Sequence, residues 1–499
     1  MVAELITAIQ PAIVLLAKGA LALFSGLVCA SIVLPGIFVP LLQIVCRPLF
    51  GRFEREELLK FLRMGLVFAC IIGAYWSLRT MKNSLFTTLA GSNGIPYAKT
   101  LSLLCMFVFI AGYTWLLDRY PREKVFYLLS GLYGGLAILF GAGLVFIEAP
   151  KAVIAARSLF PWIITQVFAY FFYVFIESYG SLVVALFWAI TTDVTSPESA
   201  KKGFSLVVAL GQIGGIFAPT YINSLPIYFG HTTSGAAVAF DGFIMVLASL
   251  FLLFLMKCTP ADIMKSFHGK NEAQKEHEQE PGFMEGFWLL LNNRYLLGIF
   301  AVIFSFEAIV TIFDFNFNFL VDQQYHGLAK HAYMGEYGSW VNIIALACLL
   351  LGVNNITRVL GVGVALAMMP VIVGGAIGGF VAFHNLQYLF WIMVFSKAIN
   401  YALMGPALKQ LYIPTTHDVR FKAQAWIETF GSRGSKEAGS IVNMTDGAFQ
   451  WGFGALAGHN YYVIMSACLG LGVVGGWFLI ALFLGRTYRR AIETNTVVC

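Results

Sequence analysis

The chain has 499 residues, of which 59% are hydrophobic and only 12% are charged. A soluble domain usually carries about 25% charged residues, so this composition, with a mean hydropathy of +0.77, excludes a water-soluble globular protein. The formal net charge of +6 does not indicate nucleic-acid binding, because basic residues in membrane proteins mostly report topology. The eight cysteines form no CxxC pair and no metal-ligand spacing, so no cofactor or metal is expected.

The first apolar stretch is predicted to be a retained membrane segment and not a cleaved signal peptide. Residues 1–10 contain no Lys or Arg, so the basic region that begins a signal peptide is missing. The apolar run from about Ala12 to Cys46 is too long for a signal sequence, and Pro35 and Pro40 interrupt it. Residues 1–59 are therefore expected to be a hydrophobic extension with a basic linker.

Twelve further apolar runs follow, and each can supply the roughly 20 residues that a membrane-spanning helix requires. We expect an all-α, polytopic, major-facilitator-like bundle made of two six-helix halves, 60–256 and 286–485. A polar, mixed-charge linker at 257–285 separates the halves, and a tail at 486–499 ends the chain. The expected span centres are residues 72, 107, 136, 175, 212, 246, 308, 345, 370, 397, 447 and 472.

Lys and Arg residues concentrate in alternate loops, which predicts the orientation of the chain. The basic loops precede the first of the twelve spans and follow the second, fourth, sixth, eighth, tenth and last spans. The positive-inside rule places these loops in the cytoplasm. The C-terminus is therefore expected in the cytoplasm and the N-terminus outside, in a monomer that lies in the cell (inner) membrane.

The two halves contain a weak internal sequence repeat. Thr191-Thr192-Asp193 follows the fourth span, and Thr415-Thr416-His417-Asp418 follows the tenth, each with basic residues and glycines after it. Repeated halves with a substrate site between them are a common transporter design. This repeat favours a transporter over a channel.

Few ionisable residues fall inside the apolar runs, and such residues are functional candidates because burying them in lipid is costly. Arg79 and Lys82 are three residues apart, so they share one helix face and could hold a polyanion such as a phosphate chain. The alternative is that both reach outward to lipid headgroups. Glu177 lies in mid-span, where it could pair with either cation as a substrate-linked acid or only as a structural ion pair.

Two acids of the seventh span are further candidates. Asp314 is the counterpart of the Arg79–Lys82 region, and Glu307 lies two turns earlier on nearly the same face. Asp241, in the sixth span, is expected to be a span-end residue.

The glycine pairs Gly214-Gly215 and Gly374-Gly375 are interpreted as helix-packing sites and not as hinges, because small residues let helices approach closely. The sequence has no phosphate-binding GxxxxGK[ST] loop, no HExxH, no GxSxG and no Rossmann fingerprint. Transport driven by exchange or by an ion gradient is therefore expected, and an enzyme is not.

Four stretches resemble the non-mitochondrial nucleotide transporters of obligate intracellular bacteria and plastids. They lie in the expected order and span about residues 60 to 485. They are Leu78–Lys82 with Gly91-Ser92 and Pro96–Lys99; Glu177–Ser181 through Asp193 to Lys201; Met334-Gly335 with Trp340; and Ser396-Lys397 through Tyr412–Pro414 and Lys422 to Arg433 and Lys436.

This resemblance implies twelve spans, a major-facilitator-like architecture and exchange of ATP for ADP. It also implies that Lys82 and Glu177 match charged substrate residues of the family, and that Asp314 replaces a family Glu. Two family cations are lost: Asn318 stands for a Lys, and the 420–424 stretch has one charge fewer. The expected substrate-binding residues are Arg79, Lys82, Glu177, Asp193, Asp314, Lys397, Arg420, Lys422, Arg433 and Lys436.

Three functions stay open at this point. The first is a nucleotide exchanger, most simply of ATP and ADP, whose in-membrane cations bind phosphates. The second is a proton-coupled importer of another nucleotide derivative or organic anion, with Glu177 or Asp314 as the proton carrier. The third is a non-transporting receptor on a transporter scaffold, which the retained charges inside the spans argue against.

Overall fold

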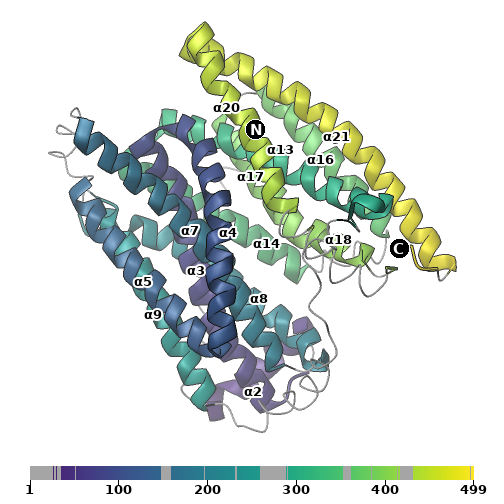
Figure 1. Ribbon diagram of the computed structural model, residues 1–499. Helices are drawn as coiled ribbons and strands as arrows, with labels where there is room; N and C mark the ends of the chain where they lie inside the picture. The colour runs from purple at the N-terminus through teal and green to yellow at the C-terminus, as the bar shows by residue number, and fades with distance from the viewer. Residues whose placement is uncertain are drawn as a thin grey trace. The chain divides into compact units, whose positions relative to one another are not determined.

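The structure, a computed structural model, describes most of the chain from Pro35 onward (Figure 1). Apart from a few isolated residues, the described ranges are 35–50, 52–147, 159–195, 197–230, 233–258, 290–351, 361–383, 385–412, 414–415, 431–494 and 496–498. Within these ranges all regular secondary structure is helical, which confirms the all-α class. Most of the predicted linker 257–285 lies outside the described residues, as does most of the chain before Pro35.

Each of the twelve expected span centres falls inside a different helix of the described part. The first six helices are α3 (Arg55–Ala90), α4 (Ile95–Arg119), α5 (Arg122–Ile147), α7 (Leu159–Asp193), α8 (Pro197–Tyr228) and α9 (Gly235–Cys258). The second six are α13 (Arg294–Gln324), α14 (Gly327–Leu350), α16 (Val362–Phe383), α17 (Leu386–Ile399), α20 (Ser432–Phe453) and α21 (Ala455–Thr494). A helix satisfies its own backbone hydrogen bonds, so it can cross lipid without unpaired polar groups.

Nine helices in the described residues are long and apolar enough to cross a membrane. The three others among the twelve are α14, α17 and α20. Helix α17 has only 14 residues but continues through the π-helical turn η2 (Asn400–Met404) into α18 (Gly405–Leu411). Helix α20 is long enough but carries charged residues along its length. The shorter α2 (Pro35–Phe50) precedes the twelve.

The chain divides into two compact units, which are described separately below. Unit 1 comprises Met1–Thr80, Gly112–Ala149 and Tyr179–Glu276, and unit 2 comprises Met81–Ala111, Pro150–Ser178 and His277–Cys499. Helices α3, α4 and α7 contribute residues to both units. The predicted six-helix halves were divided at the polar linker 257–285 and not by contacts between helices. Their boundaries stay a prediction.

In unit 1, glycines bring helices into backbone contact. Helix α9 packs along α5, and a Cβ atom added to Gly141 would lie 2.6 Å from the carbonyl oxygen of Gly235. Helix α8 meets α3 in the same way, since a Cβ on Gly214 would lie 2.1 Å from the carbonyl oxygen of Ala69. This contact confirms the packing interpretation of Gly214.

Unit 1 also contains a buried polar network between α3, α8 and α9. Ser77 Oγ lies 2.7 Å from Asp241 Oδ2 and 2.8 Å from Asn223 Oδ1, and the Asn223 amide donates to Thr80 Oγ1 at 2.9 Å. Asp241 lies in the first two turns of α9, near the expected span end, but it is fully buried. Its carboxylate joins helices and does not face the headgroups.

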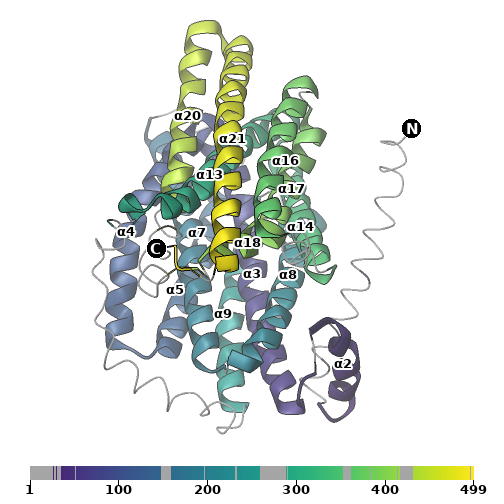
Figure 2. The same ribbon diagram turned by 90° about the vertical axis from the view of Figure 1, so that its right-hand side faces the viewer.

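In unit 2, α13 packs against α17, α20 and α21, while α16 packs along α21 and α14 along α17 (Figures 1 and 2). Helix α13 starts after Asn293, whose side chain accepts hydrogen bonds from two backbone N–H groups of the first turn. The 3-10 turn η1 (Ser92–Gly94) leads into α4 and contacts α13 and α20. Gly91 precedes it with a φ of 83°, a left-handed conformation that favours glycine. The start of α4 is thereby held near α13 and α20.

In the pair Gly374-Gly375, only Gly374 lies at a helix contact, although both were predicted to be packing sites. A Cβ on Gly374 would lie 3.2 Å from a methyl group of Val474, which is a tight helix contact. A Cβ on Gly375 would meet no atom within 4 Å, so the packing interpretation is wrong for Gly375. The reason is that adjacent residues on a helix point about 100° apart, so only one of them can face the neighbouring helix.

We predict that Gly214→Ala lowers the apparent Tm of the detergent-solubilised protein, because its methyl group would push α8 away from the Ala69 backbone. Overpacking of this kind costs about 1–3 kcal/mol. The control Gly375→Ala, where space is open, should leave Tm unchanged or raise it slightly, since Ala favours a helix by about 1 kcal/mol over Gly. Equal Tm values for both variants would contradict the close helix contact.

Candidate functional site

Lys82 of α3 and Glu177 of α7 form an ion pair in unit 2. The Lys82 side chain is only 5% exposed and its Nζ lies 4.0 Å from the ring centroid of Tyr173, whereas Glu177 is 37% exposed. Tyr173 and Glu177 are four residues apart on α7, so both side chains face the same ammonium group. An ion pair expected for Glu177 is present, and it joins a buried cation to a partly exposed carboxylate.

Asp314 of α13 lies between two lysines in unit 2. Lys99 Nζ of α4 is 3.4 Å from Asp314 Oδ2, and Lys397 Nζ of α17 is 3.7 Å from Oδ1. We call these three side chains the Asp314 cluster. Both distances exceed the roughly 2.7–2.9 Å of a strong charge-assisted hydrogen bond. One carboxylate and two ammonium groups leave the cluster with one net positive charge, which suits an anionic ligand.

The backbone around the cluster fixes its members. The Asn318 amide donates to the carbonyl oxygen of Asp314 at 2.6 Å, one turn along α13. Lys397 lies in the last turn of α17, directly before the π-helical turn η2. Its Nζ is 5.2 Å from the Tyr337 ring centroid, and the side chain is mostly buried. Short π-helical segments are frequent at functional sites, where they redirect a side chain.

Helix α20 contributes two charged residues, Lys436 and Glu437, that contact α13 and α4 near the Asp314 cluster. Lys436 Nζ lies 3.8 Å from Glu307 Oε2 on α13, and the Thr100 hydroxyl donates to Glu437 Oε1 at 2.6 Å. Thr100 directly follows Lys99, and Glu437 directly follows Lys436. Helices α4, α13 and α20 therefore meet through adjacent polar residues. Glu307 and Asp314 lie seven residues apart on α13, a spacing that predicts nearly the same helix face.

The remaining predicted residues are distributed as follows. Arg79 belongs to unit 1, where its guanidinium group donates to the Tyr75 hydroxyl at 3.1 Å and lies 5.1 Å from the Trp76 ring centroid. Arg433 is half-buried in the first turn of α20. Asp193 is the last residue of α7, but its side chain lies outside the described part, as do the whole residues Arg420 and Lys422.

Two lysines of unit 2 that pair with carboxylates, Lys99 and Lys330, are absent from the predicted substrate-binding residues. Lys99 is partly buried, with 17% of its side chain exposed. Lys330 is 2% exposed and pairs with Asp322 and with the Thr87 hydroxyl. The signal for Lys99 was its place in the Pro96–Lys99 stretch that carries the family resemblance. Lys330 had no such signal in the sequence.

The sequence comparisons agree with this picture. Residues 45–390 match the family model described as TLC ATP/ADP transporter. The ADP,ATP carrier protein 1 of Rickettsia typhi is 24% identical over 493 residues, with 90% of this chain and 97% of the relative covered. The chloroplastic ADP,ATP carrier protein 2 of Arabidopsis thaliana is 24% identical over 477 residues, with 87% of this chain and 75% of the relative covered.

Two solved structures share the fold. A bacterial homologue of the iron transporter ferroportin, in an inward-facing state, matches with a TM-score of 0.58 at 12% identity over 85% of this chain and 98% of its own. A peptide transporter POT matches with a TM-score of 0.55 at 12% identity over 84% and 95%. The expected major-facilitator-like fold is confirmed. Nine helices of the described part are candidate membrane spans. Because the family model covers more than half of the sequence, the chain belongs to the TLC ATP/ADP transporter family.

Proposed function

We propose that this protein exchanges ATP for ADP across a membrane by alternating access, as a secondary-active transporter. The observation that carries the proposal is the family match over residues 45–390, together with relatives named ADP,ATP carriers. The Asp314 cluster supports it chemically, because two lysines that share one carboxylate can both turn toward a phosphate chain.

The Asp314 cluster gives a physical basis for exchange. Without substrate, Asp314 serves as the counter-ion of Lys99 and Lys397, so neither cation is left unpaired in an apolar helix bundle. A di- or triphosphate competes for the same ammonium groups, and each charge-assisted hydrogen bond contributes about 1.5–3 kcal/mol. A substrate can change the conformational equilibrium only through its different affinity for the two states. Exchange follows if the carrier changes state readily only when phosphate replaces the carboxylate.

The other predicted residues take supporting roles in this proposal. Lys82, with Glu177 as its counter-ion and Tyr173 against its ammonium group, would provide a second phosphate contact. Lys436, whose Nζ lies 3.8 Å from Glu307 Oε2, would likewise bind phosphate in place of this carboxylate. We further propose that Arg79, Asp193, Arg420, Lys422 and Arg433 contribute to the substrate path. The carrier would act as a monomer in the inner membrane, with its C-terminus in the cytoplasm.

The first test is counterflow in liposomes. Purified protein should take up labelled ADP only when the liposomes contain ATP or ADP, and a protonophore should leave the uptake unchanged. This result follows from a carrier that changes state only when loaded. Uptake into nucleotide-free liposomes that a protonophore abolishes would instead establish proton-coupled import and contradict the exchange mechanism.

The second test removes one cation of the Asp314 cluster. Lys397→Gln should reduce kcat/KM for exchange about 10- to 100-fold, the loss expected for one charge-assisted hydrogen bond to phosphate. Lys124→Gln, at an exposed lysine in the first turn of α5, is the matched control and should leave exchange unchanged. Both variants should be inserted at the wild-type level. Wild-type kinetics for Lys397→Gln would remove this lysine from the substrate site.

The third test removes the shared carboxylate. Asp314→Asn frees Lys99 and Lys397 from their counter-ion, so nucleotide should bind more tightly while release becomes slower. We expect KM and kcat to fall together, a combination that lost folding alone would not produce. Asp322→Asn also removes an acid paired with a lysine, Lys330, and should leave KM unchanged. A raised KM in Asp314→Asn would contradict the counter-ion role.

A further inference from the structure

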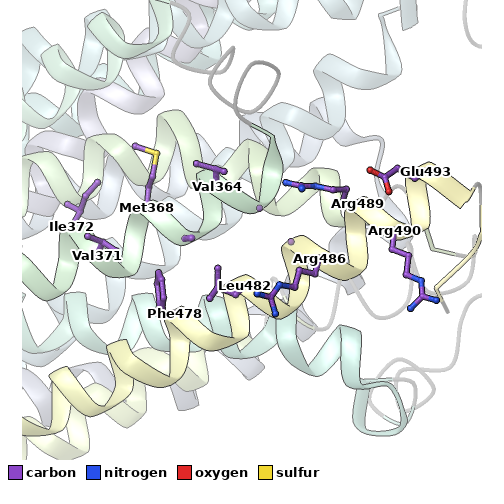
Figure 3. A pocket seen from close by; sticks show the side chains of 13 residues that line it. Val364, Met368, Val371, Ile372, Phe478, Leu482, Arg486, Arg489, Arg490 and Glu493 are labelled. Carbon is purple, nitrogen blue, oxygen red and sulfur yellow. The ribbon is translucent and has the colours of Figure 1, made fainter.

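An open groove of about 650 Å³ runs between α16 and α21 in unit 2 (Figure 3). Its apolar part is formed by side chains of both helices, including Met368, Val371, Phe478 and Leu482. Val371 is 62% exposed although it lies in the middle of a candidate membrane span. The groove therefore opens where hydrocarbon chains surround the protein.

The floor of the groove depends on two glycines. Gly363 and Gly485 face each other, and a Cβ on Gly485 would lie 2.5 Å from the Cα atom of Gly363. The helix backbones thus touch here, while larger side chains on either side stand apart and leave the groove between them. Such a groove accepts a narrow, flexible, apolar chain better than a rigid planar ring.

One end of the groove is cationic. Arg486, Arg489 and Arg490 line it there, with Glu493 beyond them (Figure 3). The three arginine side chains are exposed, and within the described residues no carboxylate makes an ion pair with them. They follow the apolar part of α21 directly, at the depth where a membrane helix meets the headgroups. Three guanidinium groups beside one carboxylate leave two net positive charges.

We propose that this groove is a binding site for an anionic phospholipid. One acyl chain lies along the apolar part between α16 and α21, and the arginines hold the headgroup phosphate. Guanidinium groups bind phosphate oxygens in a bidentate manner. Basic pockets between membrane helices on the cytoplasmic side are suited to anionic headgroups, because that leaflet carries anionic lipid. The expected cytoplasmic position of the end of α21 agrees with this orientation.

Lipid retention by the full-length protein tests the site directly, independently of nucleotide transport. Protein purified in detergent is mixed with phosphatidylglycerol and phosphatidylcholine of identical acyl chains, and the retained lipid is counted by native mass spectrometry. The wild type should retain phosphatidylglycerol preferentially. Replacing Arg486, Arg489 and Arg490 with Gln should weaken this preference by about fivefold for each arginine. The single variant Arg489→Gln gives the same test if the triple variant does not fold.

Two matched controls separate the groove from general surface charge. Neutralising Arg119, Arg122 and Lys124, a basic group predicted on the same membrane side, should leave the retention unchanged. Val371→Trp fills the groove and should abolish retention, whereas Leu479→Trp, at a 68% exposed position of α21 outside the groove lining, should not. Equal losses from both charge triples, or unchanged retention in Val371→Trp, would overturn the proposal. So would displacement of the lipid by inorganic phosphate or ATP alone, which would make this a site for soluble anions.

Discussion

The arrangement of unit 2 depends on pairing lysines with carboxylates inside apolar helices. An isolated ammonium group in this environment would cost several kcal/mol, so every buried lysine there has to lie beside an acid or a polar group. Lys82, Lys330 and Lys397 meet this requirement through Glu177, Asp322 and Asp314. In the proposed exchange, a phosphate would replace the acid beside Lys82 or Lys397 without leaving the cation unpaired.

The pairs differ in how firmly the cation is held. Lys330 has a carboxylate and a threonine hydroxyl as partners and is almost fully buried, which suits a structural role. The Asp314 cluster has longer separations, an excess positive charge and an adjoining π-helical turn. It therefore has both the charge to attract an anion and a backbone irregularity that can accommodate movement. The Lys82–Glu177 pair is intermediate, with a buried cation and a partly exposed acid.

Close helix packing gives these charged residues fixed positions. Gly214, Gly141 and Gly485 allow backbones to touch, and larger residues beside such contacts hold neighbouring helices apart. In unit 2 the backbone contact between Gly363 and Gly485 lies at the groove proposed for phospholipid. The Asp314 cluster and the groove proposed for lipid thus lie on different helices of one unit: α4, α13 and α17 for the cluster, and α16 and α21 for the groove.

The sequence by itself determined the class of the protein, the positions of twelve of its helices and its family. These properties depend on local hydrophobicity and short motifs, which are readable residue by residue. It also identified Asp314, Lys82 and Glu177 as unusual charges in apolar runs, and Lys397 through the family resemblance. Only the tertiary structure decided which charges pair, since Lys99 meets Asp314 across 215 positions of the chain. It likewise decided that Gly214 packs while Gly375 does not, because a contact between helices depends on their relative rotation.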